Sequence, residues 1–281
     1  MKGELTVRLN GNKDFTPELK VFNGGEVNVC IPDRKGYPTA PVYAVITAQI
    51  LDSEMLIALL LLNDALRRKF PTLEEIGLKL PYAPYARQDR VCNSGESLTV
   101  KVFTNLINSC NFSAVKILDP HSDVVTSLIN KVIVEDSSKI LREFCLSGGI
   151  EGVEDLTLVS PDFGATKKVE KLAKELGHTS IIQGTKERDL KTGALSGFGF
   201  YGDVKGKDLL IVDDICDGGG TFVGLTKELE DAGCRSISLY VTHGIFSRGV
   251  NYLLDNGIDR VYTTNSLPQE QVEGLEVIKV I

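Results

Sequence analysis

Residues 209–221 (Leu-Leu-Ile-Val-Asp-Asp-Ile-Cys-Asp-Gly-Gly-Gly-Thr) place acids and glycines between an apolar run and a helical pattern. The run 209–212 predicts a buried parallel strand with Asp213 and Asp214 at its carboxyl end. Residues 222–233 predict a helix that ends in glycine. Ligands of open α/β sheets bind outside the carboxyl ends of the strands, so we expect the acids and glycines to lie in a binding site.

The polar residues of this segment suit a sugar phosphate. Glycines let successive backbone N–H groups converge on a phosphate at a helix N-terminus, where the helix dipole also favours negative charge. Adjacent carboxylates accept hydrogen bonds from ribose hydroxyls, directly or through Mg²⁺. The residues predicted to bind the ribose and its phosphate are therefore Asp213, Asp214, Asp217, Gly218, Gly219, Gly220 and Thr221.

Two common nucleotide-binding loops fit this segment less well. Its three consecutive glycines do not make the Gly-x-Gly-x-x-Gly of a dinucleotide loop, and three carboxylates would repel a bare pyrophosphate. The chain also contains no Gly-x-x-x-x-Gly-Lys-Ser/Thr, which argues against a P-loop ATPase. A purely structural turn would not need a pair of acids above an apolar strand.

Composition favours a soluble intracellular α/β protein. A chain of 281 residues accommodates one large or two modest α/β domains, and 25% charged with 42% hydrophobic residues is ordinary for a globular protein. The net charge of −7 argues against a nucleic-acid binder, and no apolar run is long enough to cross a membrane. Six scattered cysteines without a Cys-x-x-Cys pair indicate reduced thiols, and no signal peptide is evident, so we expect a cytoplasmic protein.

Apolar runs alternate with helical patterns in two halves, which predicts mostly parallel sheets flanked by helices. The first half is predicted to contain strands over 27–31, 42–48, 75–80 and 114–118, with helices over 53–69 (capped by Asp52 or Ser53) and 98–110. The second is predicted to contain strands over 156–160, 180–182, 209–212 and 236–241, with helices over 164–176 and 222–233. The predicted domains are 1–140 and 141–281. Residues 190–202, with five glycines, indicate a loop or hairpin near a site.

A second chemically rich segment follows the predicted strand 75–80. Residues 82–90 (Tyr-Ala-Pro-Tyr-Ala-Arg-Gln-Asp-Arg) offer two arginines, an amide and two aromatic rings. Arg87 and Arg90 suit the oxygens of a triphosphate, and Gln88 suits an adenine edge or a phosphate. Two arginines at this spacing more often belong to a solvated loop, so the pair alone is weak, whereas the whole string is more specific.

The whole string resembles the ATP-binding loop of ribose-phosphate pyrophosphokinases, and residues 213–221 resemble the loop that this family shares with type I phosphoribosyltransferases. Further segments resemble the family in the same order along the chain, namely residues 95–101, 119–122, 159–164, 186–188 and 242–247. The resemblance therefore spans nearly the whole chain. It implies an α/β fold with two similar type I phosphoribosyltransferase-like domains, the N-terminal one with the ATP loop and the C-terminal one with the ribose-phosphate loop.

The resemblance also implies a reaction, in which the β,γ-diphosphoryl group of MgATP is transferred to the anomeric hydroxyl of a ribose phosphate. It implies that ATP is bound by Arg87, Gln88 and Arg90, joined by Phe22 and Glu26 of a neighbouring subunit in a homo-oligomer. It implies that His121 and Asp162 ligate Mg²⁺. The catalytic residues it implies are Lys186, Arg188 and His121, the two cations stabilising the transferring group.

The chain departs from the family pattern at three places. Gly218 stands where the family usually has threonine, so a phosphate-binding hydroxyl is missing and the loop gains room. Residues 22–26 read Phe-Asn-Gly-Gly-Glu rather than Phe-x-Asp-Gly-Glu, so an acid near the base is missing. Residues 90–96 contain one basic residue where the family has several.

These departures bear on the acceptor more than on the reaction. Ribose 5-phosphate is the first prediction, and ADP-ribose, as in similar enzymes of phage-type NAD salvage, is the alternative. A non-catalytic regulatory homologue is disfavoured because the catalytic positions are retained. A base-consuming phosphoribosyltransferase would share residues 213–221 but not 82–90 or 119–122.

Overall fold

The computed structural model describes residues 1–281 except 151, 154, 178–180 and 189–194. The chain divides into two compact units, Met1–Glu135 and Asp136–Val280. The predicted boundary between residues 140 and 141 falls inside helix α4 (Ser137–Leu146), which belongs to the second unit. Among the described residues, no helix has the length and apolar character needed to span a membrane.

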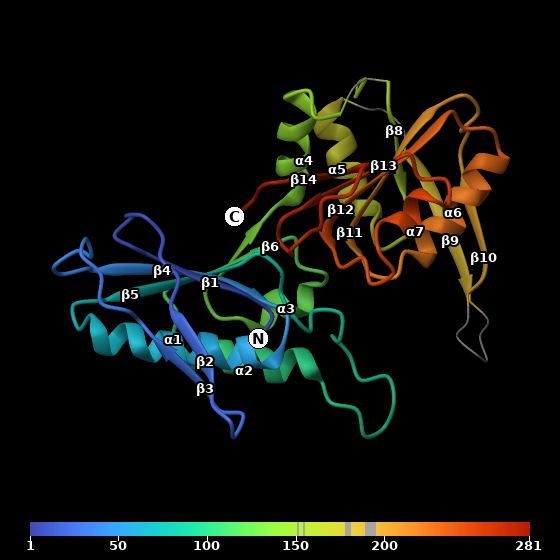
Figure 1. Cartoon of the computed structure of the whole chain (residues 1–281). Coiled ribbons are helices and arrows are strands. Elements are labelled where there is room, and N and C mark those ends of the chain that lie inside the picture. The colour runs from blue at the N-terminus through green and yellow to red at the C-terminus, as the bar shows by residue number, and fades with distance from the viewer. Residues whose placement is uncertain (151, 154, 178–180, 189–194) are drawn as a thin grey trace. The chain divides into compact units, whose positions relative to one another are not determined.

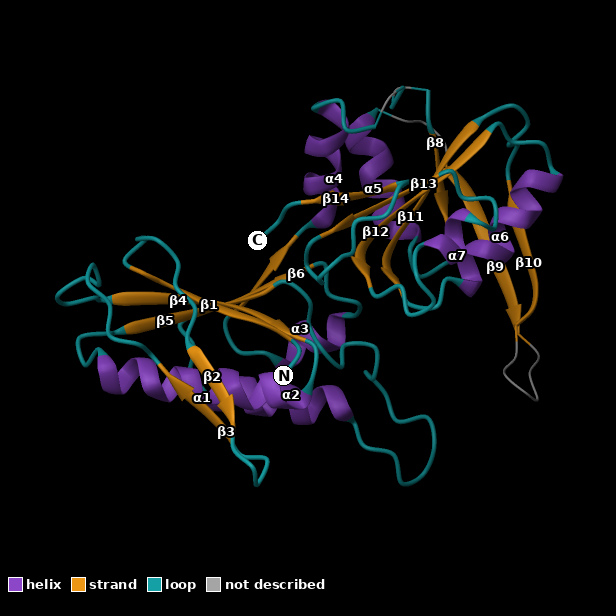
Figure 2. Ribbon diagram, viewed as in Figure 1, coloured by secondary structure: helices purple, strands orange, loops and turns teal. Residues whose placement is uncertain are grey.

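The first unit is built on a five-stranded sheet (Figures 1 and 2). Strands β4, β5, β6 and β7 run parallel, and β1 pairs antiparallel with β4 at one edge. Strands β2 and β3 form a separate hairpin. The strands are β1 (Gly3–Leu9), β2 (Glu18–Val21), β3 (Val27–Cys30), β4 (Tyr43–Ile50), β5 (Glu75–Leu80), β6 (Val115–Leu118) and β7 (Val132–Glu135); the helices are α1 (Ser53–Lys69), α2 (Thr99–Ser109) and α3 (Asp123–Leu128).

Periodic apolar residues decide which faces of this unit are buried. Helix α1 buries Met55, Leu59, Leu62 and Leu66, which recur at helical spacing and pack on the sheet. Strand β1 buries its alternate apolar residues Leu5, Val7 and Leu9. This strand was not among the predicted ones, although its residues alternate with the period of two typical of a strand.

The second unit is a seven-stranded sheet in the order β10-β9-β8-β11-β12-β13-β14. All neighbours are parallel except β10, which is antiparallel to β9. The strands are β8 (Thr157–Ser160), β9 (Ile181–Arg188), β10 (Leu195–Tyr201), β11 (Asp208–Cys216), β12 (Ser236–Gly244), β13 (Arg260–Thr264) and β14 (Leu275–Ile278); the helices are α4 (Ser137–Leu146), α5 (Thr166–Leu176), α6 (Gly220–Asp231) and α7 (Asn251–Leu254).

Strand β11 is buried on both faces, which explains its unbroken apolar run. Leu209 and Ile211 pack in the cluster that contains α6 residues, and Leu210 and Val212 pack in the cluster that contains α4 and α5 residues. A central parallel strand with helices on both faces has no side left for alternating polar residues. The prediction of mostly parallel sheets flanked by helices is therefore correct for both units.

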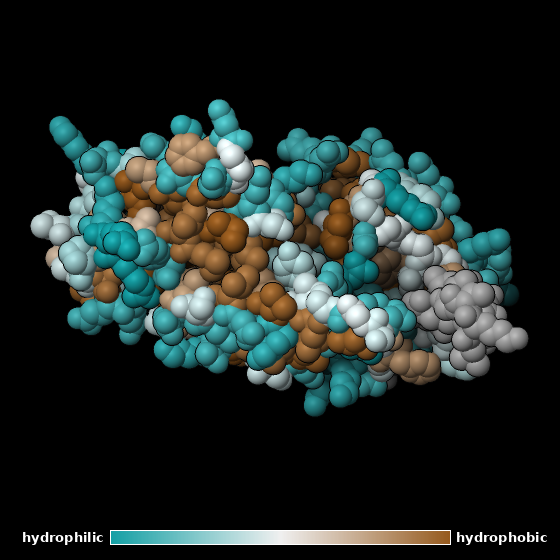
Figure 3. Space-filling view, turned by 90° about the horizontal axis from the view of Figure 1, so that it is seen from below, coloured by the Kyte–Doolittle hydropathy of each residue, from teal (hydrophilic) through white to brown (hydrophobic). Residues whose placement is uncertain are grey.

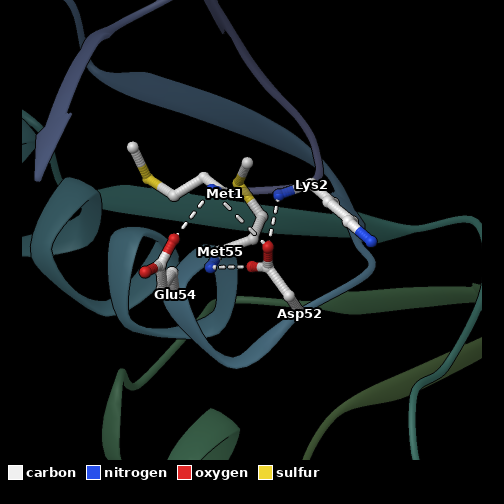
Figure 4. Close-up of polar contacts among 5 residues, drawn as sticks. All are labelled: Met1, Lys2, Asp52, Glu54 and Met55. Atoms are coloured by element: carbon white, nitrogen blue, oxygen red, sulfur yellow. Dashed lines mark hydrogen bonds and ion pairs between the residues drawn. The ribbon is translucent and has the colours of Figure 1, made fainter.

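Asp52 caps helix α1 and also ties it to the start of β1 (Figure 4). Its Oδ1 accepts a hydrogen bond from the Met55 N–H at 2.8 Å, and its Oδ2 accepts one from the Lys2 N–H. The Met1 ammonium donates to Glu54 at 2.7 Å beside it. The sequence analysis left the cap open between Asp52 and Ser53, and the structure assigns it to Asp52.

Replacing Asp52 by alanine is expected to lower the free energy of unfolding by about 1–2 kcal/mol, because two backbone donors lose their acceptor. Urea denaturation of the wild type and of the variant would measure this. Asp52→Asn keeps an oxygen acceptor and is the matched control, expected to lose less. Equal stabilities of Asp52→Ala and wild type would contradict the assigned cap.

Candidate active site

The acidic segment lies at the carboxyl edge of the second sheet. Strand β11 runs from Asp208 to Cys216, so Asp213 and Asp214 belong to the strand itself rather than following it, a correction to the predicted end at residue 212. Asp217 comes directly after the strand. Helix α6 begins at Gly220, two residues earlier than predicted, and therefore takes Gly220 and Thr221 into its first turn.

Gly219 is the residue that turns the chain from the strand into helix α6. Its backbone has φ 75°, in the left-handed region that favours glycine. A Cβ atom at this position would lie 2.7 Å from Leu253 Cδ2, so the Leu253 side chain already occupies the space that a side chain at residue 219 would need. Next to it, a Cβ at Gly220 would meet nothing within 4 Å. The space beside Gly220 is therefore open at the N-terminus of α6, the part of a helix whose unpaired N–H groups bind phosphates.

The adjacent acids of β11 disfavour each other's charged forms. Burial raises the pKa of Asp213 well above its usual range, and the neighbouring Asp214 raises it further, while Lys168 on α5 opposes the shift. Asp213 Oδ1 also accepts a hydrogen bond from the Asp214 N–H at 2.9 Å. Hydrogen bonds from sugar hydroxyls, or a bound hard cation, stabilise the charged form of such a pair of carboxylates.

Cys216 lies between these acids but is unsuited to be a nucleophile. Burial raises its pKa to about 12, and Asp213 and Asp217 add to the shift. The thiol therefore stays protonated at neutral pH, and the reactive thiolate is not available. All six cysteines of the chain are free, in line with the expectation of no disulfides.

The loop after β12 lies against the acidic segment. The Ile245 N–H donates to the Cys216 carbonyl at 2.8 Å, and the Ser247 N–H donates to the Asp217 carbonyl at 3.0 Å. His243 is buried inside β12 with its Nδ1 2.8 Å from Ser266 Oγ. The sequence analysis gave this loop no role, although residues 242–247 were among the family motifs.

Asp162 follows β8 at the same edge, since β8 pairs in parallel with β11. Its Oδ1 accepts the N–H groups of Gly164 at 2.8 Å and Ala165 at 3.2 Å. The carboxylate therefore shapes the turn into α5, beside its predicted role in metal binding. It is partly exposed, so the two roles are compatible.

Lys186 and Arg188 lie inside strand β9, which continues to residue 188 instead of ending at 182 as predicted. They are thus not in a turn after a short strand. Their side chains lie outside what the structure describes. Residues 195–201, part of the predicted loop or hairpin 190–202, form β10 and pair with β9, so this part is a hairpin.

In the first unit, the segment 82–90 and His121 lie beside each other. Strands β5 and β6 are parallel neighbours, so the segments that follow them share one edge of the sheet. Asp89 belongs to the first of these segments and lies close to the second. The hydrogen bond from Arg90 at 2.9 Å lowers the pKa of Asp89, and partial burial opposes this shift. Ser122 and His121 also lower this pKa, which places both close to Asp89. Arg87, Gln88 and Arg90 are exposed, as is His121.

Phe22 and Glu26 lie at the turn of the β2–β3 hairpin. Phe22 is 46% exposed, with Lys20 Nζ 4.8 Å from its ring centroid. A Cβ at Gly24 would lie 2.5 Å from Glu26 Oε2. The Glu26 carboxylate therefore occupies the space where a residue-24 side chain of the family pattern would begin.

The structure thus gathers the predicted residues into two groups, one in each unit. Of the described residues, no set of three His, Cys, Asp or Glu side chains is grouped as a metal site. His121 and Asp162 belong to different units, and their sharing of one metal ion stays a prediction.

Comparisons with known proteins find similarity to ribose-phosphate pyrophosphokinases. Residues 11–110 match the family model of the N-terminal domain of ribose phosphate pyrophosphokinase, and residues 193–281 match that of the phosphoribosyl synthetase-associated domain. A ribose-phosphate pyrophosphokinase of Aquifex aeolicus is 30% identical, with 93% of this chain and 83% of that protein covered. One of Mycoplasmopsis pulmonis is 28% identical, with 93% and 80% covered.

The likeness extends to a solved structure. The phosphoribosylpyrophosphate synthetase of Mycobacterium smegmatis superposes with a TM-score of 0.79 at 25% identity, covering 94% of this chain and 86% of that one. This confirms the predicted fold class of two phosphoribosyltransferase-like α/β domains.

Proposed function

The chain belongs to the ribose-phosphate pyrophosphokinase family, and we propose on that basis that it transfers the β,γ-diphosphoryl group of MgATP to ribose 5-phosphate. The products are phosphoribosyl pyrophosphate and AMP. The observation that carries the proposal is the paired carboxylates of β11 followed at once by the glycine-opened N-terminus of α6. The relatives named above are ribose-phosphate pyrophosphokinases, which favours ribose 5-phosphate over ADP-ribose as the acceptor.

The proposed reaction needs positioning and positive charge rather than a protein nucleophile. The anomeric oxygen of the ribose bonds to the β-phosphorus as the bond from that phosphorus to the α,β-bridging oxygen breaks, and AMP leaves. Asp213 and Asp214 accept hydrogen bonds from the ribose hydroxyls and orient the sugar. Arg87 and Arg90 bind the triphosphate, and Lys186 with Arg188 stabilises the charge that spreads over the transferring group.

Magnesium fits the residues available. Mg²⁺ is ordinarily held by one or two carboxylates together with substrate phosphates and water. Asp162 offers a partly exposed carboxylate and His121 an exposed ring nitrogen, and these are the residues proposed to hold the ion. When bound, Mg²⁺ would neutralise charge on the ATP phosphates.

The test is AMP release from ATP and Mg²⁺ in the presence of ribose 5-phosphate, and separately of ADP-ribose. We expect AMP with ribose 5-phosphate. AMP with ADP-ribose alone would keep the reaction and change the acceptor. Release with neither acceptor would overturn the proposed function.

Self-association is proposed as well, because Phe22 and Glu26 are expected to serve the ATP site of a neighbouring subunit. Figure 3 shows apolar side chains gathered on the face of the first unit that carries α1 and the β2–β3 hairpin. Exposed apolar residues of these elements include Val21, Ile57 and Leu61. Such a face on a globular protein commonly marks an interface.

Leu61→Lys, alone and with Ile57→Lys, is expected to shift the protein to a lower oligomeric state, because a charge on α1 would be buried in the interface. Light scattering after size exclusion measures the mass. Leu146→Lys, at an exposed position on α4, is the control and should leave the mass unchanged. Equal masses for Leu61→Lys and wild type would show that this face is not the interface.

A further inference from the structure

The loop between β12 and α7 is fixed against the phosphate-binding segment. Two backbone hydrogen bonds, from the Ile245 and Ser247 N–H groups to the carbonyls of Cys216 and Asp217, hold the two loops together. Both carbonyls lie just before the glycines. Residues 247 and 248 are thereby placed beside the glycines by the backbone.

Gly218 lies close to this loop. A Cβ at Gly218 would lie 3.6 Å from Arg248 Nε and 3.7 Å from Ser247 Oγ, which is ordinary van der Waals contact. The backbone of Gly218 is outside the left-handed region, so its conformation does not require glycine. Because Gly218 has no side chain, the Arg248 guanidinium lies next to the backbone of the phosphate-binding segment.

Arg248 is an exposed cation that carries no ion pair within the described part of the chain. Its guanidinium lies over the Tyr252 ring, 5.0 Å from the centroid, which limits its orientation without neutralising it. The site beside it contains three acids, Asp213, Asp214 and Asp217. A phosphate dianion entering such a site needs more positive charge than the partial charge of one helix N-terminus supplies.

We propose that Arg248, which lies beside Gly218 at the phosphate-binding segment, binds the 5-phosphate of the acceptor and so sets the enzyme's requirement for a phosphorylated ribose. This inference rests on the proposed function for the identity of the acceptor. A guanidinium donates hydrogen bonds to two oxygens of a phosphate at once. Arg248 thus takes over the role of the hydroxyl that the family has at position 218.

The experiment compares steady-state kinetics of wild type, Arg248→Ala and Arg248→Lys. A hydrogen-bonded contact to a charged group is worth enough that Arg248→Ala should raise the KM for ribose 5-phosphate roughly 10- to 100-fold. The KM for ATP and kcat should stay within about twofold, because Arg248 touches neither ATP nor the reacting atoms on this reading. Arg248→Lys should fall in between, since it keeps the charge but not the paired donors.

The matched control is Arg260→Ala, an exposed arginine at the amino end of β13, where no change is expected. Gly218→Thr, which restores the family's hydroxyl, should reduce the effect of removing Arg248. An unchanged KM for ribose 5-phosphate in Arg248→Ala, or an equal rise in the KM for ATP, would overturn the inference.

Calorimetric titration with ribose 5-phosphate separates this inference from the proposed function. If the wild type binds ribose 5-phosphate without turning it over, the proposed function fails, and weaker binding by Arg248→Ala alone still supports the inference. Equal binding by wild type and Arg248→Ala, or no binding by the wild type, would overturn it.

Discussion

Asp213→Asn is expected to impair use of the acceptor strongly while making the folded protein more stable. The carboxylate is proposed to accept ribose hydroxyls, and losing a charged acceptor should lower kcat/KM for ribose 5-phosphate roughly 100-fold. The gain in stability has a separate cause. Burial and the adjacent Asp214 make the charged form of Asp213 unfavourable in the folded protein, and asparagine removes that charge.

The pH dependence of stability follows from the direction of this pKa shift. The pKa of Asp213 is raised on folding. At a pH between the unfolded and folded pKa values, the folded protein therefore holds a proton that the unfolded chain has lost. The contribution of Asp213 to stability therefore falls as pH rises from the unfolded pKa through the raised folded one, and stays low above it. In Asp213→Asn this loss should be absent.

Thermal unfolding of both proteins between pH 4 and pH 8 would measure the effect. Asp208→Asn, at the opposite end of β11, is the matched control. Its carboxylate pairs with Arg235 at 2.9 Å, so we expect a small loss of stability and unchanged activity. A less stable Asp213→Asn, or one with normal activity, would contradict the account of this acid.

Arg87→Ala is expected to lower kcat/KM for ATP by roughly 100- to 1,000-fold, because the transferring phosphates lose a charged donor. Binding of ribose 5-phosphate, measured by calorimetry, should not change. This pattern separates a pyrophosphokinase from a base-consuming phosphoribosyltransferase, in which Arg87 should matter little.

The control for this variant is Arg8→Ala, an exposed arginine on β1 whose Nε pairs with Asp14 at 2.7 Å. It should retain full activity. If Arg87→Ala retained wild-type kinetics with ATP, the assignment of residues 82–90 to nucleotide binding would be wrong.

Local patterns predicted the elements whose limits are set locally. The prediction for helix α1, 53–69, matches its observed limits, because its apolar period and basic last turn lie within it and its capping acid directly precedes it. Strand β11 was ended too early, at residue 212. Its continuation to Cys216 depends on pairing with β12, where Ile215 pairs with His243 and Cys216 with Gly244, and a local window cannot show such partners.

The same distinction between local and long-range signals applies to the residues of the candidate site. Acids and glycines that share one segment, such as Asp213 and Gly219, were found from their spacing. The neighbourhood of Gly218 and Arg248 was not, because these residues are far apart in sequence and meet only through the pairing of β11 with β12. Helix α4 was also missed, although Asp136 caps it through the Ser138 N–H.

The three glycines at the start of α6 differ in how much change they tolerate, which matters for anyone redesigning the enzyme. At Gly219 any other residue would have to adopt an unfavourable backbone φ, and its side chain would clash with Leu253. Gly218 and Gly220 have neither obstacle. A mutant library aimed at unnatural sugars should therefore randomise the two outer positions and leave the middle one alone.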